Sequence, residues 1–245
     1  MFRSFLIPVD ICKYVVKHNL YRSFQFYLLL KSQCDGQLRI TNDDYETYAT
    51  TLGMKHGKSL KITMQKLLKL NWVGYNTETE FYYIRGIKKV QSLVGGRSRC
   101  AAYFEMDRLH DLKAFVAAQI MGYLARCQRA KELATGLVKR SPNHIAGNLR
   151  LLRFYQMANK AVAAMLGIAQ STVFELKKLA EKANFIIVKK NFQFLGMPKQ
   201  QLSILNRMCI PNANRIRIVN GQCVLQTSDT IHCNLSFNKR KKLEH

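Results

Sequence analysis

The chain has 245 residues, of which 48% are hydrophobic, and carries 39 Lys and Arg against 15 Asp and Glu, a formal net charge of +24 at pH 7. The hydrophobic content excludes a disordered tail and suffices for the cores of two domains. The positive charge exceeds what solubility requires and indicates a polyanionic partner, with nucleic acid as the first candidate and an acidic membrane as the second.

Cysteine usage and hydropathy indicate the compartment. The seven cysteines, an odd number, include no Cys-x2-Cys pair, which argues against a zinc site and against a disulfide framework. No cleavable signal opens the chain, and the longest apolar run, residues 114–125, is too short to span a bilayer and is bounded by Lys113 and Arg126. We therefore expect a cytoplasmic protein without a membrane partner, in which this run is a core helix.

The first predicted elements run from residue 10 to residue 53. Residues 10–34 are apolar at helical spacing and end near Gly36, a residue typical of helix ends. Residues 37–40 fit a short strand. Thr41 then provides an N-cap, followed by early acidic residues, for a helix that ends at Gly53.

A basic helix is predicted over residues 58–70, with Ser59 near its start. Its apolar residues follow the i, i+4, i+7, i+8 rule and define an inward face of Leu60, Met64, Leu67 and Leu68. The opposite face carries Lys58, Lys61, Ile62, Gln65 and Lys69. This opposite face is our first candidate for insertion into a DNA groove.

A hairpin and a junction follow this helix. Residues 72–76 and 81–85 flank a polar turn and predict a hairpin whose tip lies in solvent. Residues 86–107 contain Gly95 and Gly96, which mark either a flexible joint or a turn into a strand at 100–104, and we place the domain boundary there. A long helix is expected over about residues 108–134, the segment 135–142 breaks it, and Asn143 caps a further helix through Met157.

A second basic helix is predicted after Gly167, with Ser171 as its N-cap. The inward stripe is Val173, Leu176, Ala180 and Ala183, and the outward positions are Gln170, Thr172, Glu175, Lys178 and Lys182. Gln, Ser and Thr near the helix start suit base edges, whereas the later lysines suit phosphates. Glu175 either accepts a hydrogen bond from a cytosine amine or indicates that this face points away from DNA.

The two basic helices lie in duplicated surroundings. An Ala-x3-Gly pattern precedes each helix, at Ala49 and Ala163, and an Asn-aromatic-β-branched triplet follows each, at residues 71–73 and 184–186. A helix-turn-helix needs a small residue where its helices cross, a Gly that accepts positive φ at the turn, and an apolar residue that pins the second helix, here Leu60 and Val173.

Residues 20–86 and 143–192 resemble the winged helix-turn-helix superfamily in these features, and the hairpin at 185–190 would be the second wing. The first copy differs by one additional turn residue. The resemblance implies that each unit lays its lysine-bearing helix in a major groove and rests its wing on the DNA backbone.

Charge is concentrated in the C-terminal part of the chain. Residues 1–96 hold 14 Lys and Arg and 7 Asp and Glu, whereas residues 97–245 hold 25 and 8. The basic run at 238–242 is expected to contact phosphates, the alternative being a tail that only aids solubility. Residues 243–245 look like the remnant of an expression tag and are set aside.

Enzyme signatures are weak. The segment from Gly53 to Ser59 reads Gly-x3-Gly-Lys-Ser, one residue short of a phosphate-binding loop, and follows a helix-like segment instead of a strand. The histidines are scattered singly, and close carboxylate pairs are few, which argues against nuclease and recombinase sites. We expect no enzymatic activity, no cofactor and no metal.

These patterns predict an α+β, mostly helical protein: a winged-helix domain at 1–96, a linker and connecting helix at 97–142, and a second winged-helix domain with a basic tail at 143–242. The expected function is binding of duplex DNA, and the architecture is similar to that of plasmid and phage replication initiators. The alternatives are a transcriptional regulator and, in another class, an RNA-binding or protein-docking scaffold. A second copy of the chain and the replication or transcription machinery are further candidate partners.

The residues expected to contact DNA lie at or near the exposed faces of the two basic helices, on the second wing or in the basic tail. They are Lys55, Lys58, Ser59, Lys61, Ile62, Gln65, Lys69, Gln170, Ser171, Thr172, Glu175, Lys178, Lys182, Lys189, Lys190, Lys239, Arg240, Lys241 and Lys242.

Overall fold

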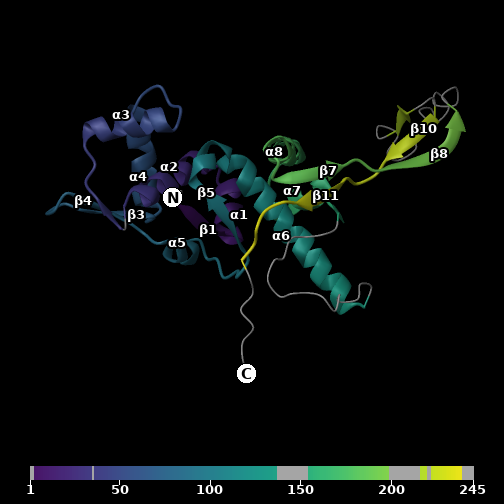
Figure 1. Ribbon diagram of the computed structural model, residues 1–245, viewed down its shortest axis with the longest axis horizontal. Coiled ribbons are helices and arrows are strands. Elements are labelled where there is room, and N and C mark those ends of the chain that lie inside the picture. The colour runs from purple at the N-terminus through teal and green to yellow at the C-terminus, as the bar shows by residue number, and fades with distance from the viewer. Residues whose placement is uncertain (1–2, 35, 137–153, 199–215, 220–221, 239–245) are drawn as a thin grey trace.

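The computed structural model describes residues 3–34, 36–136, 154–198, 216–219 and 222–238, and shows an α+β protein (Figure 1). The view is elongated, with α3 and β4 at one end and β8 and β10 at the other. Helix α6 crosses the middle of the molecule. Three small three-stranded sheets and one two-stranded sheet are distributed around the helices of the described chain.

The N-terminal segment begins with a strand that the sequence patterns did not predict, β1 (Ser4–Pro8). The single helical stretch expected over residues 10–34 is wrong in detail, because it is two helices, α1 (Val9–Lys17) and α2 (Tyr21–Gln33). The break falls at Asn19, whose φ of 52° is left-handed and incompatible with a continuous helix. Val9 through Val16 and Phe24 through Leu30 supply most of the buried surface of these helices.

The first repeat contains β2 (Gln37–Leu38), α3 (Asn42–Thr51), α4 (Lys58–Lys69), β3 (Val73–Asn76) and β4 (Phe81–Ile84), close to the predicted elements. Its sheet has the strand order β2-β4-β3. Thr41 caps α3 as predicted, and its hydroxyl and backbone N–H both bond to the Asp44 carboxylate, which lowers the pKa of Asp44. A short helix that was not predicted, α5 (Ile87–Leu93), follows the hairpin.

The glycine pair at 95–96 leads into a strand, β5 (Ala101–Glu105), which pairs antiparallel with β1. Of the two interpretations of this segment, a turn into a strand is therefore correct. Asp10 holds the turn, because its Oδ2 accepts hydrogen bonds from the Ser98 backbone N–H at 2.7 Å and from Gln91 Nε2 at 3.2 Å. The junction is thus tied to α1.

The second repeat begins with η1 (Met106–Asp111) and α6 (Leu112–Ala134), which together match the predicted long helix. It continues with β6 (Tyr155–Gln156), α7 (Asn159–Leu166), α8 (Gln170–Lys182), β7 (Ile186–Lys189) and β11 (Thr230–Cys233). Most of the helix expected from Asn143, up to residue 153, lies outside the described residues. Its predicted end at Met157 is wrong, because Tyr155 and Gln156 form a strand that pairs with β11.

The sheet of the second repeat has the order β6-β11-β7, which reproduces the connectivity of β2-β4-β3. The hairpin between its second and third strands is much longer than in the first repeat. It contains β8 (Phe192–Pro198), β9 (Ile216–Val219) and β10 (Gln222–Gln226), which form a separate sheet of order β8-β10-β9. The predicted hairpin at 185–190 is therefore one strand, and its partner strand lies far downstream.

The duplication extends to backbone geometry. Gly53 and Gly167, at the two turns, have φ values of 65° and 66°, as expected for glycine at a helix end. Asn71 and Asn184, at the ends of α4 and α8, also adopt positive φ, 56° and 59°. The aromatic residue that follows each Asn donates its backbone N–H to a helix carbonyl at 3.0 Å, and the next residue opens β3 or β7.

A continuous hydrophobic core runs through the described part of the chain and joins both repeats. Helix α6 packs against α1 on one side and against α8 on another. Gly122 of α6 allows β11 and the segment after it to approach the helix closely, since a Cβ there would lie 2.6 Å from the Phe237 ring and 2.7 Å from Cys233 Sγ. The two repeats are therefore fused through shared packing.

Candidate nucleic-acid interface

Helix α4 buries one stripe and exposes the rest. Leu60, Met64 and Leu67 are buried as predicted, and Leu68 is half-buried. Thr63 is also buried, with its hydroxyl donating to the Ser59 carbonyl at 2.9 Å. The helix is thus anchored by an i, i+3, i+4, i+7 stripe, which leaves the opposite face free.

The exposed face of α4 is cationic. Every position selected from the sequence in this region is exposed: Lys55, Lys58, Ser59, Lys61, Ile62, Gln65 and Lys69. Lys66 is exposed as well and was missed by the prediction, and α4 contains no acidic residue. Lys61 is partly engaged, because its Nζ donates to Asn42 Oδ1 at 2.8 Å. Ile62 is 59% exposed in the middle of this face.

The N-terminus of α4 is occupied by a carboxylate of the chain itself. The Gly57 backbone N–H donates to Glu46 Oε2 at 3.0 Å, and a Cβ at Gly57 would lie 2.9 Å from the Tyr45 carbonyl carbon. Ser59 is inside the helix, and Gly57 is its N-cap. The Glu46 carboxylate takes the place that a phosphate would take in a nucleotide-binding loop and would repel one.

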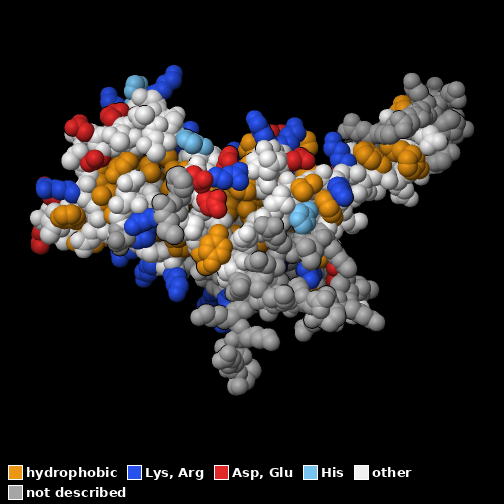
Figure 2. Space-filling view, in the orientation of Figure 1, with side chains coloured by type: hydrophobic (Ala, Val, Ile, Leu, Met, Phe, Trp, Pro, Cys, Tyr) orange, Lys and Arg blue, Asp and Glu red, His pale blue; other side chains and the backbone are white. Residues whose placement is uncertain are grey.

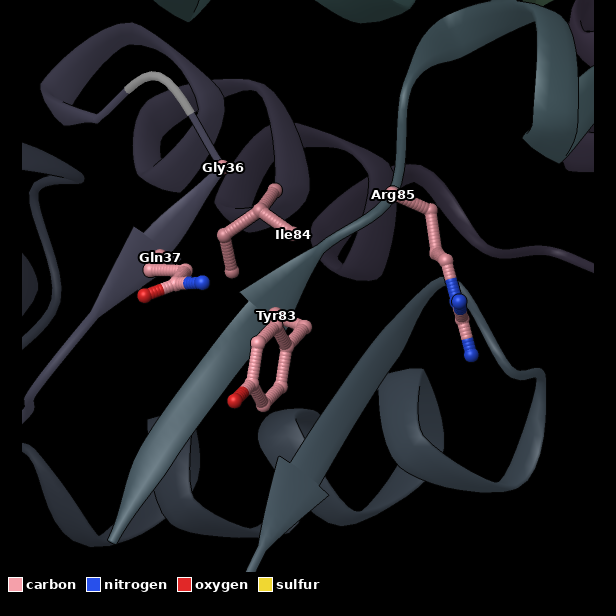
Figure 3. A pocket seen from close by; sticks show the side chains of 5 residues that line it. All are labelled: Gly36, Gln37, Tyr83, Ile84 and Arg85. Carbon is pink, nitrogen blue, oxygen red and sulfur yellow. The ribbon is translucent and has the colours of Figure 1, made fainter. Parts of the chain in front are cut away.

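The first wing, β3–β4, carries aromatic residues and one ion pair. The Tyr75 and Tyr82 rings lie 4.8 Å apart, and Arg39 pairs with Glu80 near the tip. A hollow of about 580 Å³ is lined by residues of the paired strands β2 and β4 and of their ends, Gly36, Gln37, Tyr83, Ile84 and Arg85 (Figure 3). Its single charged side chain, Arg85, donates to Asn71 Oδ1 at 3.1 Å.

Helix α8 repeats the stripe of α4. Val173, Leu176 and Ala180 are buried as predicted, and Ala183 is half-buried. The predicted N-cap at Ser171 is wrong, since the helix begins at Gln170 after an extended Ala169 and no side chain caps it. Ser171 is an exposed residue of the first turn.

Sequence analysis missed Lys177, the fourth member of this stripe, which is buried. Its Nζ lies 2.9 Å from Asp229 Oδ2 and 3.5 Å from the Met157 carbonyl oxygen. The side chains of Lys177 and Asp229 are 6% and 17% exposed. Lys177 lies seven residues before Asn184, and Met64 lies seven residues before Asn71. Met64 therefore occupies the position in α4 that Lys177 occupies in α8. The stripe spacing could have placed Lys177 inward, but nothing local to it indicated Asp229 as its partner.

The exposed face of α8 is not cationic overall. The selected positions Gln170, Ser171, Thr172, Glu175, Lys178 and Lys182 are all exposed. Glu175 and Glu181 balance Lys178 and Lys182, so the exposed charges cancel. Lys178 Nζ lies 4.5 Å from the centroid of the Phe174 ring, which is 46% exposed, and 4.0 Å from Glu175 Oε1. The two helices thus share a backbone geometry but differ in surface charge.

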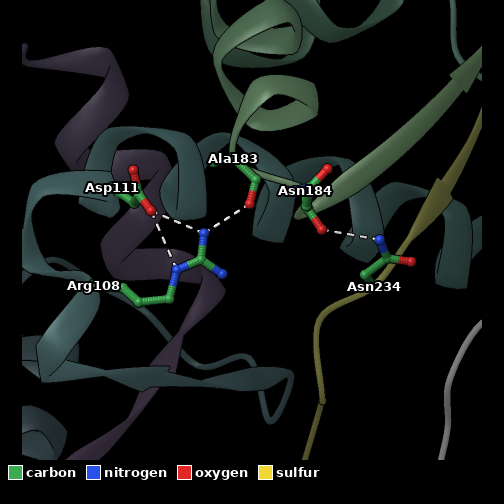
Figure 4. A network of polar contacts seen from close by, with 5 residues as sticks. All are labelled: Arg108, Asp111, Ala183, Asn184 and Asn234. Atoms are coloured by element: carbon green, nitrogen blue, oxygen red, sulfur yellow. Dashed lines mark hydrogen bonds and ion pairs between the residues drawn. The ribbon is translucent and has the colours of Figure 1, made fainter.

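A polar network fixes the C-terminus of α8 (Figure 4). Arg108 of η1 donates to the Ala183 carbonyl at 2.7 Å and to Asp111 Oδ2 at 2.8 Å, and its guanidinium lies 3.9 Å from the centroid of the Phe185 ring. Asn234 donates to the Asn184 carbonyl at 2.9 Å. Gln25 of α2 also donates to η1, at the Leu109 carbonyl, at 3.0 Å. Hydrogen bonds to η1 therefore link α2 of the N-terminal segment to α8 of the second repeat.

The remaining predicted contacts lie beyond α8. Lys189 and Lys190 are exposed where the long hairpin leaves the body, and Lys189 Nζ lies 4.0 Å from the centroid of the Phe154 ring. Lys239, Arg240, Lys241 and Lys242 lie outside the described residues. Their predecessor Asn238 is anchored on β5, because it donates to the Ala101 carbonyl and accepts from the Ala101 N–H, both at 2.9 Å. Figure 2 shows Lys and Arg side chains along the upper outline, over α3 and over α8.

No family model, curated protein or solved structure matches this chain. Across the described residues, none of the helices has both the length and the apolar character that crossing a membrane demands. In the same residues, His, Cys, Asp and Glu side chains form no group of three or more suited to hold a metal ion.

Proposed function

We propose that the protein binds duplex DNA through two winged-helix units, with α4 and α8 as the helices that enter the grooves. The exposed face of α4 carries the proposal: it presents Lys58, Lys61, Lys66 and Lys69 without any acid, on a helix held from behind by a buried stripe. The shared connectivity β-α-α-β-β and the matching turns at Gly53 and Gly167 support the assignment of both units.

The fused core supports a bipartite footprint read by one chain. Since α6 packs on α1, α2 and α8, and α2 packs on α4, we expect α4 and α8 to keep one separation and orientation. A duplex with two half-sites would then be bound without a dimer. Charge of this size also steers a protein to nucleic acid at low ionic strength.

The proposed role is a replication initiator of a plasmid, a phage or another mobile element, acting in the cytoplasm without a cofactor and without catalysing a reaction. Two tandem units in one short chain, followed by a basic run at residues 238–242, favour this role. A transcriptional regulator is the second candidate, and an RNA-binding or protein-docking scaffold is the candidate of another class.

The proposal is tested by selecting bound duplexes from a random pool and then comparing variants on the selected sequence. Lys61→Ala with Gln65→Ala, and separately Thr172→Ala with Lys178→Ala, should each weaken binding while circular dichroism shows an intact fold. The matched control is Lys88→Ala with Lys89→Ala, which removes two exposed lysines from α5. If the α4 and α8 variants bind as the parent does, neither helix forms the interface, and equal competition by duplex RNA would favour the scaffold.

A further inference from the structure

The long hairpin of the second repeat projects from the body as an arm (Figure 1). Strand β8 leaves β7 and pairs antiparallel with β10, which also pairs with β9. Hydrogen bonds hold the base of the arm, because Thr227 N–H donates to the Asn191 carbonyl and Asn191 Nδ2 donates to the Ser228 carbonyl, both at 3.0 Å. Cys223 and Val224 of β10 are fully buried, so the arm is a packed sheet.

Two aromatic rings stand exposed on β8. Phe192 is 40% exposed and Phe194 is 64% exposed, the highest value among the exposed large hydrophobic residues of the described chain. Residues two apart in a strand point to the same face at a separation of about 7 Å. Two phenyl rings in such a row form an apolar surface without a partner in the described chain, and Figure 2 shows apolar side chains along the arm.

The arm is also free of negative charge. Between Phe185 and Ser228 the sequence has no Asp or Glu and has six Lys and Arg, at 189, 190, 199, 207, 215 and 217. The first acid that follows, Asp229, is neutralised by Lys177. Lys189 and Lys190 are exposed at the root of the arm, beside the start of β8. The arm thus combines exposed phenyl rings with ammonium groups and has no acidic residue between residues 185 and 228. Phenyl rings stack on the flat faces of bases, and ammonium groups bind phosphates.

We propose that the arm binds single-stranded nucleic acid, with bases stacked on Phe192 and Phe194 and phosphates at Lys189 and Lys190. In a duplex each base has its two faces covered by neighbours about 3.4 Å away along the strand. Rings about 7 Å apart therefore meet free base faces only where the strand is unpaired. This site is separate from α4 and α8 and does not depend on the proposed binding of duplex.

Fluorescence anisotropy with a labelled oligothymidylate of about 15 nucleotides tests the site on the full chain. Phe192→Ala with Phe194→Ala should weaken binding by on the order of tenfold for each ring. Phe192→Trp with Phe194→Trp should retain binding. The matched control is Tyr103→Ala, which removes a ring that is 50% exposed on β5 and should change nothing.

Other outcomes would overturn the assignment. Equal oligothymidylate binding by the parent and the double alanine variant, with circular dichroism and melting unchanged, shows that the rings do not stack on bases. A double variant that loses only self-association in sedimentation, or only binding to anionic lipid vesicles, assigns the arm to another copy or to a membrane. The duplex proposal is judged separately, because the α4 variant Lys61→Ala with Gln65→Ala should keep the affinity for oligothymidylate.

Discussion

Lys177 Nζ lies 2.9 Å from Asp229 Oδ2 in the core of the second repeat, where the first repeat carries Met64. The ion pair joins α8 to the segment that enters β11, and the Asp229 backbone carbonyl also accepts from the Met157 N–H at 2.8 Å. It therefore ties the helix, β6 and the base of the arm together. Among the described residues Asp229 Oδ1 is buried without a hydrogen-bond partner, so the carboxylate depends on Lys177.

Removing one partner of this pair should destabilise the protein. Asp229→Asn leaves a buried ammonium group without a counter-charge and should lower the free energy of unfolding by about 3 kcal/mol. Lys177→Met with Asp229→Asn, which imitates Met64, should recover most of that loss. Urea unfolding of the parent, both single variants and the double variant measures the coupling. If the changes in the free energy of unfolding of the two single variants add up to that of the double variant, the ion pair makes no net contribution to stability.

Gly122→Ala should destabilise the packing of α6. The added Cβ would lie 2.6 Å from the Phe237 ring, so the C-terminal segment or the helix must move, at a cost of about 1 to 3 kcal/mol. Gly86→Ala is the control, since Gly86 has ordinary negative φ and nothing within 4 Å of an added Cβ. Thermal melting compares the two. Equal melting temperatures for both variants would contradict the packing.

Stability should fall at alkaline pH. Burial raises the pKa of the Cys233 thiol to about 12 from an ordinary value of 9.0, so the folded state retains a proton that the unfolded state releases. The contribution of this thiol to the free energy of unfolding is fully present below about pH 9. Above that pH it decreases by about 1.4 kcal/mol per pH unit, until the thiol of the folded state also ionises. Urea unfolding between pH 8 and 10.5 should show a smaller slope for Cys233→Ala than for the parent. Parallel curves would show that Cys233 does not contribute.

Binding to duplex DNA should depend steeply on salt. If six to ten phosphates are contacted, the logarithm of the association constant should fall against the logarithm of salt concentration with a slope of about −5 to −9. A flat salt response would point to a protein partner.

Deleting residues 238–242 should lower affinity for all sequences alike. Because Asn238 is bonded to β5, a deletion that starts at 239 separates loss of charge from loss of that anchor.

The distance between two half-sites should be fixed. Once a preferred duplex is selected, inserting about five base pairs between its halves rotates one half by half a turn. Because the two units share one continuous core, we expect them to keep their relative positions, so affinity should fall about 100-fold or more, to that of one half-site. Inserting about ten base pairs should not restore it, because the separation has changed too. Tolerance of either insertion would indicate that the two units move independently.

Local patterns predicted the elements whose signals are local. The N-cap at Thr41, the stripes of α4 and α8 and the glycines at both turns follow from spacing and backbone preference. The same patterns correctly predicted that every candidate DNA-contacting residue in the described part of the chain is exposed, although exposure does not establish binding. The break between α1 and α2 was missed because Asn19, not Gly or Pro, adopts the left-handed conformation.

Features that depend on distant residues could not be predicted. Strand β7 finds its partner β11 only after the whole arm, and Lys177 finds Asp229 at the end of the same insertion. The pairing of β1 with β5 is equally remote in sequence. The neutral face of α8 was missed for another reason: the outward positions chosen from the sequence left out Glu181, whose exposed carboxylate balances the second exposed lysine.

The pairing of β1 with β5 has a consequence for any attempt to isolate half of the molecule. A cut after residue 96 leaves Ser4–Pro8 without its ladder and uncovers the side of α1 that α6 shields. The severed fragment would offer an open strand edge beside apolar surface, a combination prone to aggregate. Heating the intact chain should accordingly melt both repeats in one cooperative event.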